Sequence, residues 1–361
     1  MGSEVSLGYL LRLPLKLAAL LVLLEASFRW IIPAAYTPYL CFDEKESILR
    51  YDPSKLRVGL YTHGGLAEIR ARWHINSMGW VNAREYAISN GRPAKPVIAV
   101  IGDSYVEAFQ VDSDHDFASV LRTELGATYE VYTFGMSGAE LSQYLQMSRY
   151  VRKAFHPQVL IFVLVDGDVL GSRLATGNKP GCVYFSHSTS GMVETLIPYA
   201  GSTAKSLYRK MALLRYIRLN RGLWVPGVSP SGDRSLDAGK DAHEIIDYAF
   251  ACIRRENPGC TVLMVVDAPR RDIYRGKIPK SNIEYRALVK SVSLQNGFHM
   301  VDLSDAMASL YYANHVKFDF DGNYHWNEHG HQVIAEQILE EWPRSRLRAR
   351  IPRSVAAPEA R

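Results

Sequence analysis

The tripeptide Gly102-Asp103-Ser104 is the part of the sequence with the clearest potential for chemistry. It follows an uninterrupted apolar run, residues 96–101, of the kind that forms a strand buried on both faces of a parallel sheet. Open α/β sheets bind ligands at the carboxyl ends of their strands, so Ser104 would present a hydroxyl nucleophile at the mouth of a crevice. The alternative is an ordinary turn, because Gly, Asp and Ser are all common turn residues.

A serine nucleophile needs a base, and the segment 319–331 offers the best candidates. It reads Asp-Phe-Asp-Gly-Asn-Tyr-His-Trp-Asn-Glu-His-Gly-His. A neutral His325 could accept the proton of Ser104, and Asp321 could fix the tautomer of that imidazole. We therefore predict a catalytic loop just before the last helix.

The same segment admits two other interpretations. It could be a solvated polar loop, or a weak metal site built from Asp319, Asp321 and the three histidines. We expect His329 and His331 to be surface residues at the start of the following helix. The cysteines show no CxxC pair and no ligand-like spacing with histidine, so disulfides or buried free thiols fit them better than zinc. They are Cys41, Cys182, Cys252 and Cys260. We expect no metal and no organic cofactor.

The elements that must position these residues alternate between strands and helices from Pro96 onward. The predicted strands are 97–101, 129–134, 159–165, 261–266 and 298–303. The predicted helices are 117–125, 140–155, 243–255, 282–294 and 330–342. Such alternation predicts βαβ units with right-handed crossovers, and therefore a three-layer α/β/α domain around a parallel sheet.

The stretch 171–241 interrupts this alternation after the third strand. It is too long for an ordinary connection, and we predict a helix of its own at 203–220. It would overhang the carboxyl edge of the sheet, either as a lid or substrate wall or as a surface elaboration. Residues 37–95 contain many turn signals and are predicted to form a connector and an irregular cap.

The N-terminus has the features of a targeting segment. Arg12 and Lys16 precede the apolar run 17–24, and Glu25 and Arg29 stand four apart, where they could pair on one helix face. An uncleaved membrane anchor, a cleaved signal peptide and an amphipathic helix all fit this pattern. We favour the anchor, because no small-residue cleavage site follows the run. That topology predicts an extracytoplasmic catalytic domain, which would be periplasmic in a bacterium.

Composition sets the remaining bounds. The 361 residues are 47% hydrophobic and 22% charged, with a net charge of +5, which is typical of a globular protein with a large core. The basic tail has no interleaved aromatic residues, so it predicts a solvated flexible end and does not favour nucleic-acid binding. The predicted organisation is an anchor or signal segment (1–36), a connector and cap (37–95), a catalytic domain (96–342) and the tail (343–361).

The chain resembles the SGNH/GDSL hydrolase superfamily in three blocks that occur in the expected order. The first is Gly102-Asp103-Ser104, and the second is 134–138, whose Gly138 would turn its backbone N–H toward an oxyanion. The third consists of Asp321, His325, Asn327 and Gly330-His331. The resemblance spans about residues 73–342 and implies a five-stranded parallel, flavodoxin-like sheet.

Within the superfamily, the segments 24–29 and 75–79 look most like the branch that carries an N-terminal membrane segment and is often linked to cell-surface polysaccharide. The resemblance implies a serine esterase in which Ser104 attacks, His325 is the base and Asp321 orients it. It implies an acyl ester, foremost an acetyl ester on a carbohydrate, or a small ester as substrate. An O-acyltransferase and a catalytically degenerate glycan-binding or assembly protein are the alternatives.

Two features depart from the superfamily pattern. The gap between Asp321 and His325 is longer than the superfamily commonly uses, which leaves Asp319 open as the orienter. Gly167 stands where an Asn usually donates its side-chain amide to the oxyanion, whereas the following Asp168 matches the pattern. The oxyanion donors would then be the N–H groups of Ser104 and Gly138, with Gly167 in place of the third. Losing one such donor typically costs roughly a hundred- to a thousandfold in rate. If the oxyanion hole is incomplete, we expect Gly167→Asn to raise activity.

Overall fold

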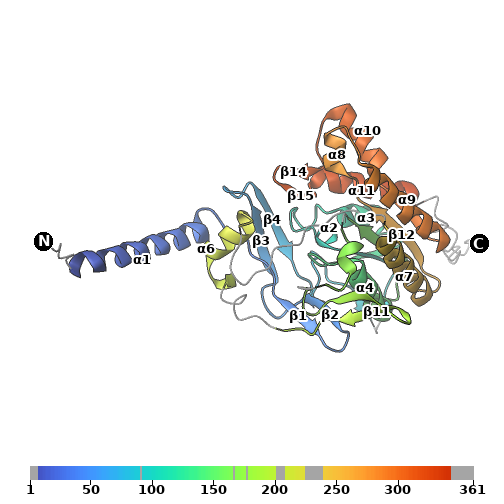
Figure 1. Cartoon of the computed structure of the whole chain (residues 1–361), viewed down its shortest axis with the longest axis horizontal. Helices are drawn as coiled ribbons and strands as arrows, with labels where there is room; N and C mark the ends of the chain where they lie inside the picture. The colour runs from blue at the N-terminus through green and yellow to red at the C-terminus, as the bar shows by residue number, and fades with distance from the viewer. Residues whose placement is uncertain are drawn as a thin grey trace, which may run out of the picture.

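A five-stranded parallel sheet forms the centre of the protein, in a computed structural model that describes residues 7–89, 92–165, 167–175, 178–200, 208–223 and 239–342 (Figure 1). Its strand order is β13-β12-β9-β7-β8, the doubly wound order that the resemblance implied. The strands are β7 (Val97–Gly102), β8 (Glu130–Gly135), β9 (Val159–Leu164), β12 (Thr261–Val266) and β13 (His299–Asp302). The predicted sheet is therefore confirmed.

Helices cover both faces of this sheet and complete the three layers. One apolar cluster joins the sheet to α4 (Leu141–Phe155), α7 (Lys240–Glu256) and α9 (Lys280–Gln295). The cluster on the opposite face joins it to α3 (Phe117–Leu125), α10 (Ser304–Asn314) and α11 (Glu328–Glu341). Two short helices, α2 (Ser104–Glu107) and α8 (Arg270–Tyr274), and the 3₁₀ turn η1 (Leu170–Ser172) follow strand ends. Every side chain of β7 and β9 is buried, as their unbroken apolar runs predicted.

The cap at 37–95 is more regular than predicted. It contains three antiparallel pairs instead of an irregular coil. They are β1 (Leu40–Asp43) with β2 (Ile48–Tyr51), β3 (Val58–His63) with β4 (Ile69–His74), and β5 (Ile88–Ser89) with β6 (Arg92–Pro93). In β4 the burial alternates from residue to residue, because one face packs on the core and the other faces solvent.

The insertion after the third strand contains a hairpin that the sequence did not predict, β10 (Val183–Ser188) with β11 (Gly191–Leu196). The helix expected at 203–220 falls partly outside the described residues, and its described end forms α6 (Ala212–Arg215) and the π-helical turn η2 (Tyr216–Asn220). The basic tail at 343–361 also lies outside the described residues. All four cysteines are free, so the structure favours thiols over disulfides.

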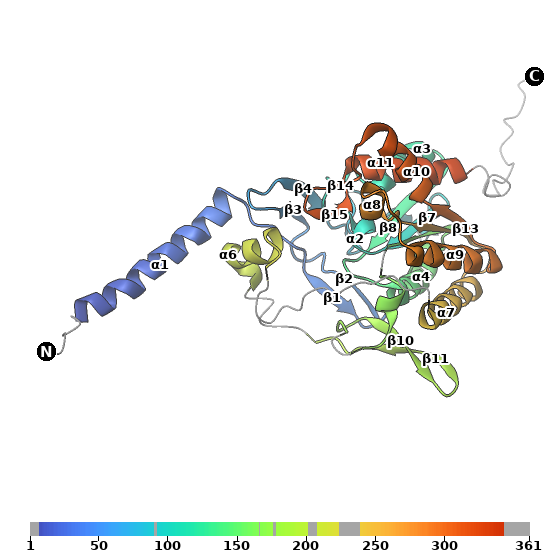
Figure 2. The ribbon, with the colours of Figure 1, turned by 45° about the horizontal axis from the view of Figure 1, so that its top comes forward.

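The N-terminal helix α1 (Leu7–Trp30) projects away from the sheet domain, and its carboxyl end meets α6 (Figure 2). Glu25 joins the two helices, because its carboxylate accepts hydrogen bonds from the backbone N–H groups of Ala212 and Leu213, each at 2.9 Å. The predicted pairing of Glu25 with Arg29 is present at 2.5 Å. Among the described residues, however, no helix has the length and apolar character that crossing a membrane requires.

Candidate active site

Ser104 lies at the carboxyl end of β7, where it begins the short helix α2. The buried carboxylate of Asp103 caps this helix by accepting a hydrogen bond from the N–H of Tyr105 at 2.9 Å. The turn is tightly packed: a Cβ on Gly102 would lie 2.4 Å from Cγ2 of Val106. The Gly-Asp-Ser pattern thus places the hydroxyl at the sheet edge, as the sequence predicted.

His325 approaches Ser104 from the other end of the chain. It lies in the strand β15 (Asn323–Trp326), which pairs with β14 (Asp319–Phe320) just before α11. Its Nε2 atom is 2.8 Å from Oγ of Ser104, within hydrogen-bond distance. The ring of Tyr105 lies against the imidazole, with 4.8 Å between the centroids. This distance is within the range that a general base needs from a hydroxyl whose proton it accepts.

The residue that orients His325 is Asn323, and not Asp321 or Asp319. Oδ1 of Asn323 lies 2.8 Å from Nδ1 of His325 and also accepts the backbone N–H of His325 at 3.1 Å. The carboxylate of Asp321 instead accepts a hydrogen bond from Lys317 at 2.8 Å, and its side chain is 91% exposed. The carboxylate of Asp319 accepts a hydrogen bond from Tyr274 at 3.2 Å. This geometry corrects the expected role of Asp321.

The strand geometry explains the correction. Side chains two residues apart in a strand lie on the same face, so Asn323 and His325 are neighbours on β15. Asp321 precedes the turn at Gly322, where φ is +77°, and so lies outside the strand. Assigning residues 323–326 to a strand would have pointed to Asn323, because that strand puts Asn323 and His325 on one face and leaves Asp321 outside it.

The contacts of Asn323 favour one tautomer of His325. Because its oxygen faces both N–H groups of His325, the ring proton belongs on Nδ1 and the lone pair on Nε2 faces Ser104. A carboxylate would select the same tautomer and would also stabilise the imidazolium that forms when Ser104 loses its proton. The amide of Asn323 can orient the imidazole of His325 in the same way, but it adds no negative charge beside the ring.

The loop after β8 carries Gly138, the expected oxyanion donor. Gly138 has φ of +65°, a left-handed conformation that glycine adopts at little cost. Lys179 Nζ donates to its carbonyl oxygen at 2.5 Å. The hydroxyl of the preceding Ser137 donates to the buried carboxyl of Glu107, which also accepts a hydrogen bond from Tyr51. Burial is the main cause that raises the pKa of Glu107 to about 7.

Gly167 lies after β9 with φ of +94°, where any side chain would be strained. The adjacent Asp168 is fully buried and holds this turn in place, because its carboxylate accepts hydrogen bonds from Val165 N and the Tyr144 hydroxyl, both at 2.8 Å. The turn is therefore built for glycine. An asparagine at this φ would strain the turn, and this strain works against the gain in activity expected from Gly167→Asn, which stays a prediction.

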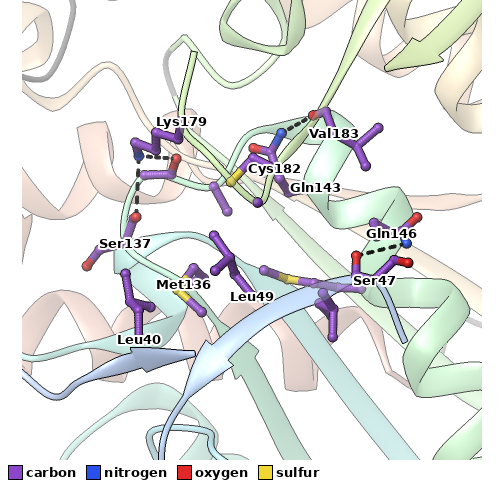
Figure 3. Close-up of a pocket in the computed structure, with 15 residues that line it drawn as sticks. Leu40, Ser47, Leu49, Met136, Ser137, Gln143, Gln146, Lys179, Cys182 and Val183 are labelled. Carbon is purple, nitrogen blue, oxygen red and sulfur yellow. Dashed lines mark hydrogen bonds between the residues drawn. The ribbon is translucent and has the colours of Figure 1, made fainter. Parts of the chain in front are cut away.

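A mostly apolar cavity of about 60 Å³ lies against the loop of Gly138 (Figure 3). Side chains from the β1–β2 hairpin, from α4 and from the start of β10 line it, among them Leu49, Met147 and Val183. Ser104 and His325 are not lining residues. Part of the loop that carries Gly138 therefore borders a cavity and is not packed on side chains there.

The three histidines of the segment 319–331 have separate environments. His329 stacks on Phe318, and His331 is buried against Phe117, whose N–H it accepts at 3.3 Å. His331 is thus a core residue and not the surface residue expected, and burial lowers its pKa to about 3. The histidines do not converge with Asp319 and Asp321. Among the described residues, the group with metal-ligating geometry is the distant His187, Asp241 and Glu244.

The chain was compared with protein-family profiles, curated protein sequences and solved structures. The sequence profile of the family described as GDSL-like Lipase/Acylhydrolase matches residues 98–338. A comparison with curated protein sequences finds no match.

Solved structures similar to the chain include a member of the lipolytic protein G-D-S-L family from Veillonella parvula DSM 2008, with 12% identity and a TM-score of 0.40 over 69% of this chain and 98% of that one. The acetyl xylan esterase AlAXEase matches with 12% identity and a TM-score of 0.42, over 68% and 98%. The lipase/acylhydrolase from Enterococcus faecalis matches with 12% identity and a TM-score of 0.39, over 68% and 95%.

Proposed function

Because the chain belongs to the GDSL-like lipase/acylhydrolase family, we propose that it is a serine esterase that works through an acyl-enzyme on Ser104. The observation that carries this proposal is the 2.8 Å contact between Ser104 Oγ and Nε2 of His325, whose Nδ1 is held by Asn323. Family membership makes the chain a hydrolase. The roles of the individual residues are our inference from their geometry.

In the proposed mechanism, His325 takes the proton of Ser104 as its oxygen attacks the ester carbonyl. The N–H groups of Ser104 and Gly138 stabilise the tetrahedral oxyanion. His325 then donates its proton to the leaving alcohol, and in the second half it activates water, which attacks the acyl-enzyme and releases the acid. These steps require no metal or organic cofactor.

The substrate class that we propose is a short acyl ester, foremost an acetyl ester on a polysaccharide. The likeness of the segments 24–29 and 75–79 to the polysaccharide-linked branch supports this choice. If a sugar hydroxyl replaces water in the second half-reaction, the same acyl-enzyme makes the protein an O-acyltransferase. Supplying an acetyl ester with a glycan acceptor, and measuring free acetate against acetylated glycan, separates the two.

A second candidate is a degenerate member that binds glycan without turnover. Two observations favour it: Asn323 orients His325 without a charge, and Gly167 offers no side-chain donor. The retained contact between His325 and Ser104 favours catalysis, because a binding module has no need of that geometry.

Hydrolysis of p-nitrophenyl acetate by the purified protein and by Ser104→Ala tests the proposal. We expect the substitution to lower kcat by roughly a thousandfold or more, since it removes the nucleophile. Circular dichroism spectra of the two proteins provide the folding control. Equal rates in both would refute the esterase mechanism, and glycan binding without turnover would support the degenerate member.

For localisation, we propose that α1 attaches the protein to a membrane and that the catalytic domain is extracytoplasmic. Apolar side chains are exposed along the helix, and Arg12 and Lys16 lie near its outer end. The exposed side chains include Leu13, Leu17, Leu20, Leu21, Val22 and Leu23. Protease protection in spheroplasts tests this arrangement, and a domain shielded together with the cytoplasm would contradict it.

A further inference from the structure

The β3–β4 hairpin lies outside the segment that the family profile matches, yet it contacts the catalytic loop twice. Nδ2 of Asn323 donates to the hydroxyl oxygen of Tyr61 at 3.0 Å. Nε2 of His63 lies 3.2 Å from the carbonyl oxygen of Gly322, at the turn before Asn323. The hairpin therefore forms part of the environment of His325.

The contact with Tyr61 matters because an amide has two unlike ends. With Oδ1 toward His325, the ring proton sits on Nδ1 and Nε2 can accept the proton of Ser104. With Nδ2 toward His325, the amide would donate to Nδ1, and Nε2 would carry the proton and could no longer act as a base. A carboxylate has two equivalent oxygens and meets no such choice, so only an Asn at this position needs its orientation fixed.

The packing around Tyr61 holds its hydroxyl where it can accept the amide N–H of Asn323. Its ring is parallel to that of Phe109, with an interplanar angle of 11° and 6.4 Å between centroids, and its hydroxyl also meets the side chain of Gln110. Burial raises the pKa of the Tyr61 hydroxyl, so it stays uncharged near neutral pH. The backbone N–H of His325 draws the amide oxygen toward the imidazole, and the contact of Nδ2 with the Tyr61 hydroxyl holds the other end of the amide in the matching orientation.

Contacts with the insertion hold the hairpin itself in place. The carbonyl oxygen of Asn220 accepts the N–H of Gly64 at 2.9 Å, and its side-chain oxygen accepts the hydroxyl of Thr62 at 3.2 Å. The hydroxyl of Tyr216 donates to the carbonyl of Gly65 at 2.8 Å. These contacts are made by residues that closely follow Tyr61 in the hairpin, so they anchor this part of the hairpin to the insertion.

We propose that Tyr61 is a positioning residue of the esterase, which acts by fixing the amide of Asn323 so that its oxygen faces His325. The inference rests on the proposed function of Ser104 and His325. It adds a residue of the N-terminal cap to the catalytic apparatus, and it accounts for how a neutral orienter can keep the productive tautomer.

The test compares Tyr61→Phe in two backgrounds, the wild type and Asn323→Asp, by hydrolysis of p-nitrophenyl acetate. In the wild type we expect kcat to fall by roughly fivefold to tenfold with KM little changed, which matches the loss of one hydrogen bond. In the Asn323→Asp background we expect a change of less than about twofold, because a carboxylate has no wrong orientation to prevent. Long-range ¹H–¹⁵N spectra of His325 give an independent readout of its tautomer. We expect the Nδ1–H tautomer to lose population in the single variant Tyr61→Phe and to keep it in the double variant with Asn323→Asp.

Tyr248→Phe is the matched control, since it removes a tyrosine hydroxyl that bonds to Glu194 in the β10–β11 hairpin, away from Tyr61 and Asn323. We expect it to leave kcat unchanged. An equal loss from Tyr61→Phe in both backgrounds, or no loss in the wild type, would overturn the positioning role while leaving the esterase in place. A wild-type protein that shows no turnover, and forms no covalent adduct on Ser104 when treated with a fluorophosphonate, would instead refute the proposed function, and this inference with it.

Discussion

The base side and the oxyanion side of Ser104 are held in different ways. On the base side, Tyr61 from the hairpin meets Asn323, while Tyr105 and Arg270 donate to the carbonyl of Tyr324 at 2.7 and 2.8 Å. On the oxyanion side, the loop of Gly138 rests on a cavity of about 60 Å³ and is tied down through the carboxyl of Glu107 and the ammonium of Lys179.

Each side also differs from what the sequence led us to expect. The base side has an amide, Asn323, where a carboxylate would stabilise the imidazolium, and the oxyanion side has Gly167 in place of a side-chain donor. On the base side, neighbouring residues fix the loop around an uncharged amide, so its geometry does not depend on a charge at residue 323. The oxyanion side depends more on a single buried carboxyl.

The largest effect that we expect concerns Glu107. Its folded pKa of about 7 lies above the unfolded value of 4.5, so the folded state keeps a proton that the unfolded state releases between these pH values. The stability from this group is therefore complete below pH 4.5 and is lost as the pH rises through 7, by about 3 kcal/mol in total. Urea unfolding from pH 4 to 8 should show this decline in the wild type relative to Glu107→Gln.

The exposed Glu336→Gln is the control for that comparison, and its unfolding curve should follow the wild type at every pH. If Glu107→Gln keeps the full pH dependence of the wild type, the carboxyl does not hold a proton in this range. The oxyanion loop would then not depend on it in the way that we describe.

A smaller loss of stability is expected from Gly167→Asn. At φ of +94° the new side chain strains the turn after β9, at a cost of about 1–3 kcal/mol. We expect a lower Tm and no gain in esterase rate. A faster enzyme would show that the turn relaxes enough to supply a side-chain donor. The oxyanion side would then tolerate a change of residue as well as the base side does.

On the base side, Asn323→Asp should raise kcat on the order of tenfold by stabilising the imidazolium of His325. The same charge raises the pKa of His325, so a higher pH is needed to keep the base neutral. The acidic limb of the kcat/KM profile should therefore move to higher pH by about one unit. An unchanged profile would mean that residue 323 does not face the imidazole.

The smallest effect is expected at Asp321. Its side chain is almost fully exposed and pairs with Lys317, so Asp321→Asn should change kcat by less than about twofold. Steady-state kinetics beside Asn323→Asp make the contrast direct. A large loss of kcat in Asp321→Asn would restore the assignment that the sequence favoured.

The sequence predicted most of the sheet and one partner of Ser104, for physical reasons. Buried apolar runs such as 159–164 define parallel strands almost to the residue, and the order of the motifs identified His325. The orienter was missed because a carboxylate near a histidine looked sufficient, whereas the turn at Gly322 places Asp321 outside the strand. Tyr61 lies 262 residues from Asn323 in the sequence, so no local pattern connects them.

The most direct test of the account is the reaction of a fluorophosphonate with the wild type and with His325→Ala, with the adduct mapped by mass spectrometry. The account predicts a single adduct on Ser104 in the wild type, formed at least about a hundredfold more slowly in His325→Ala because the general base is gone. Equal labelling rates in the two proteins, or an adduct on another residue, would contradict it.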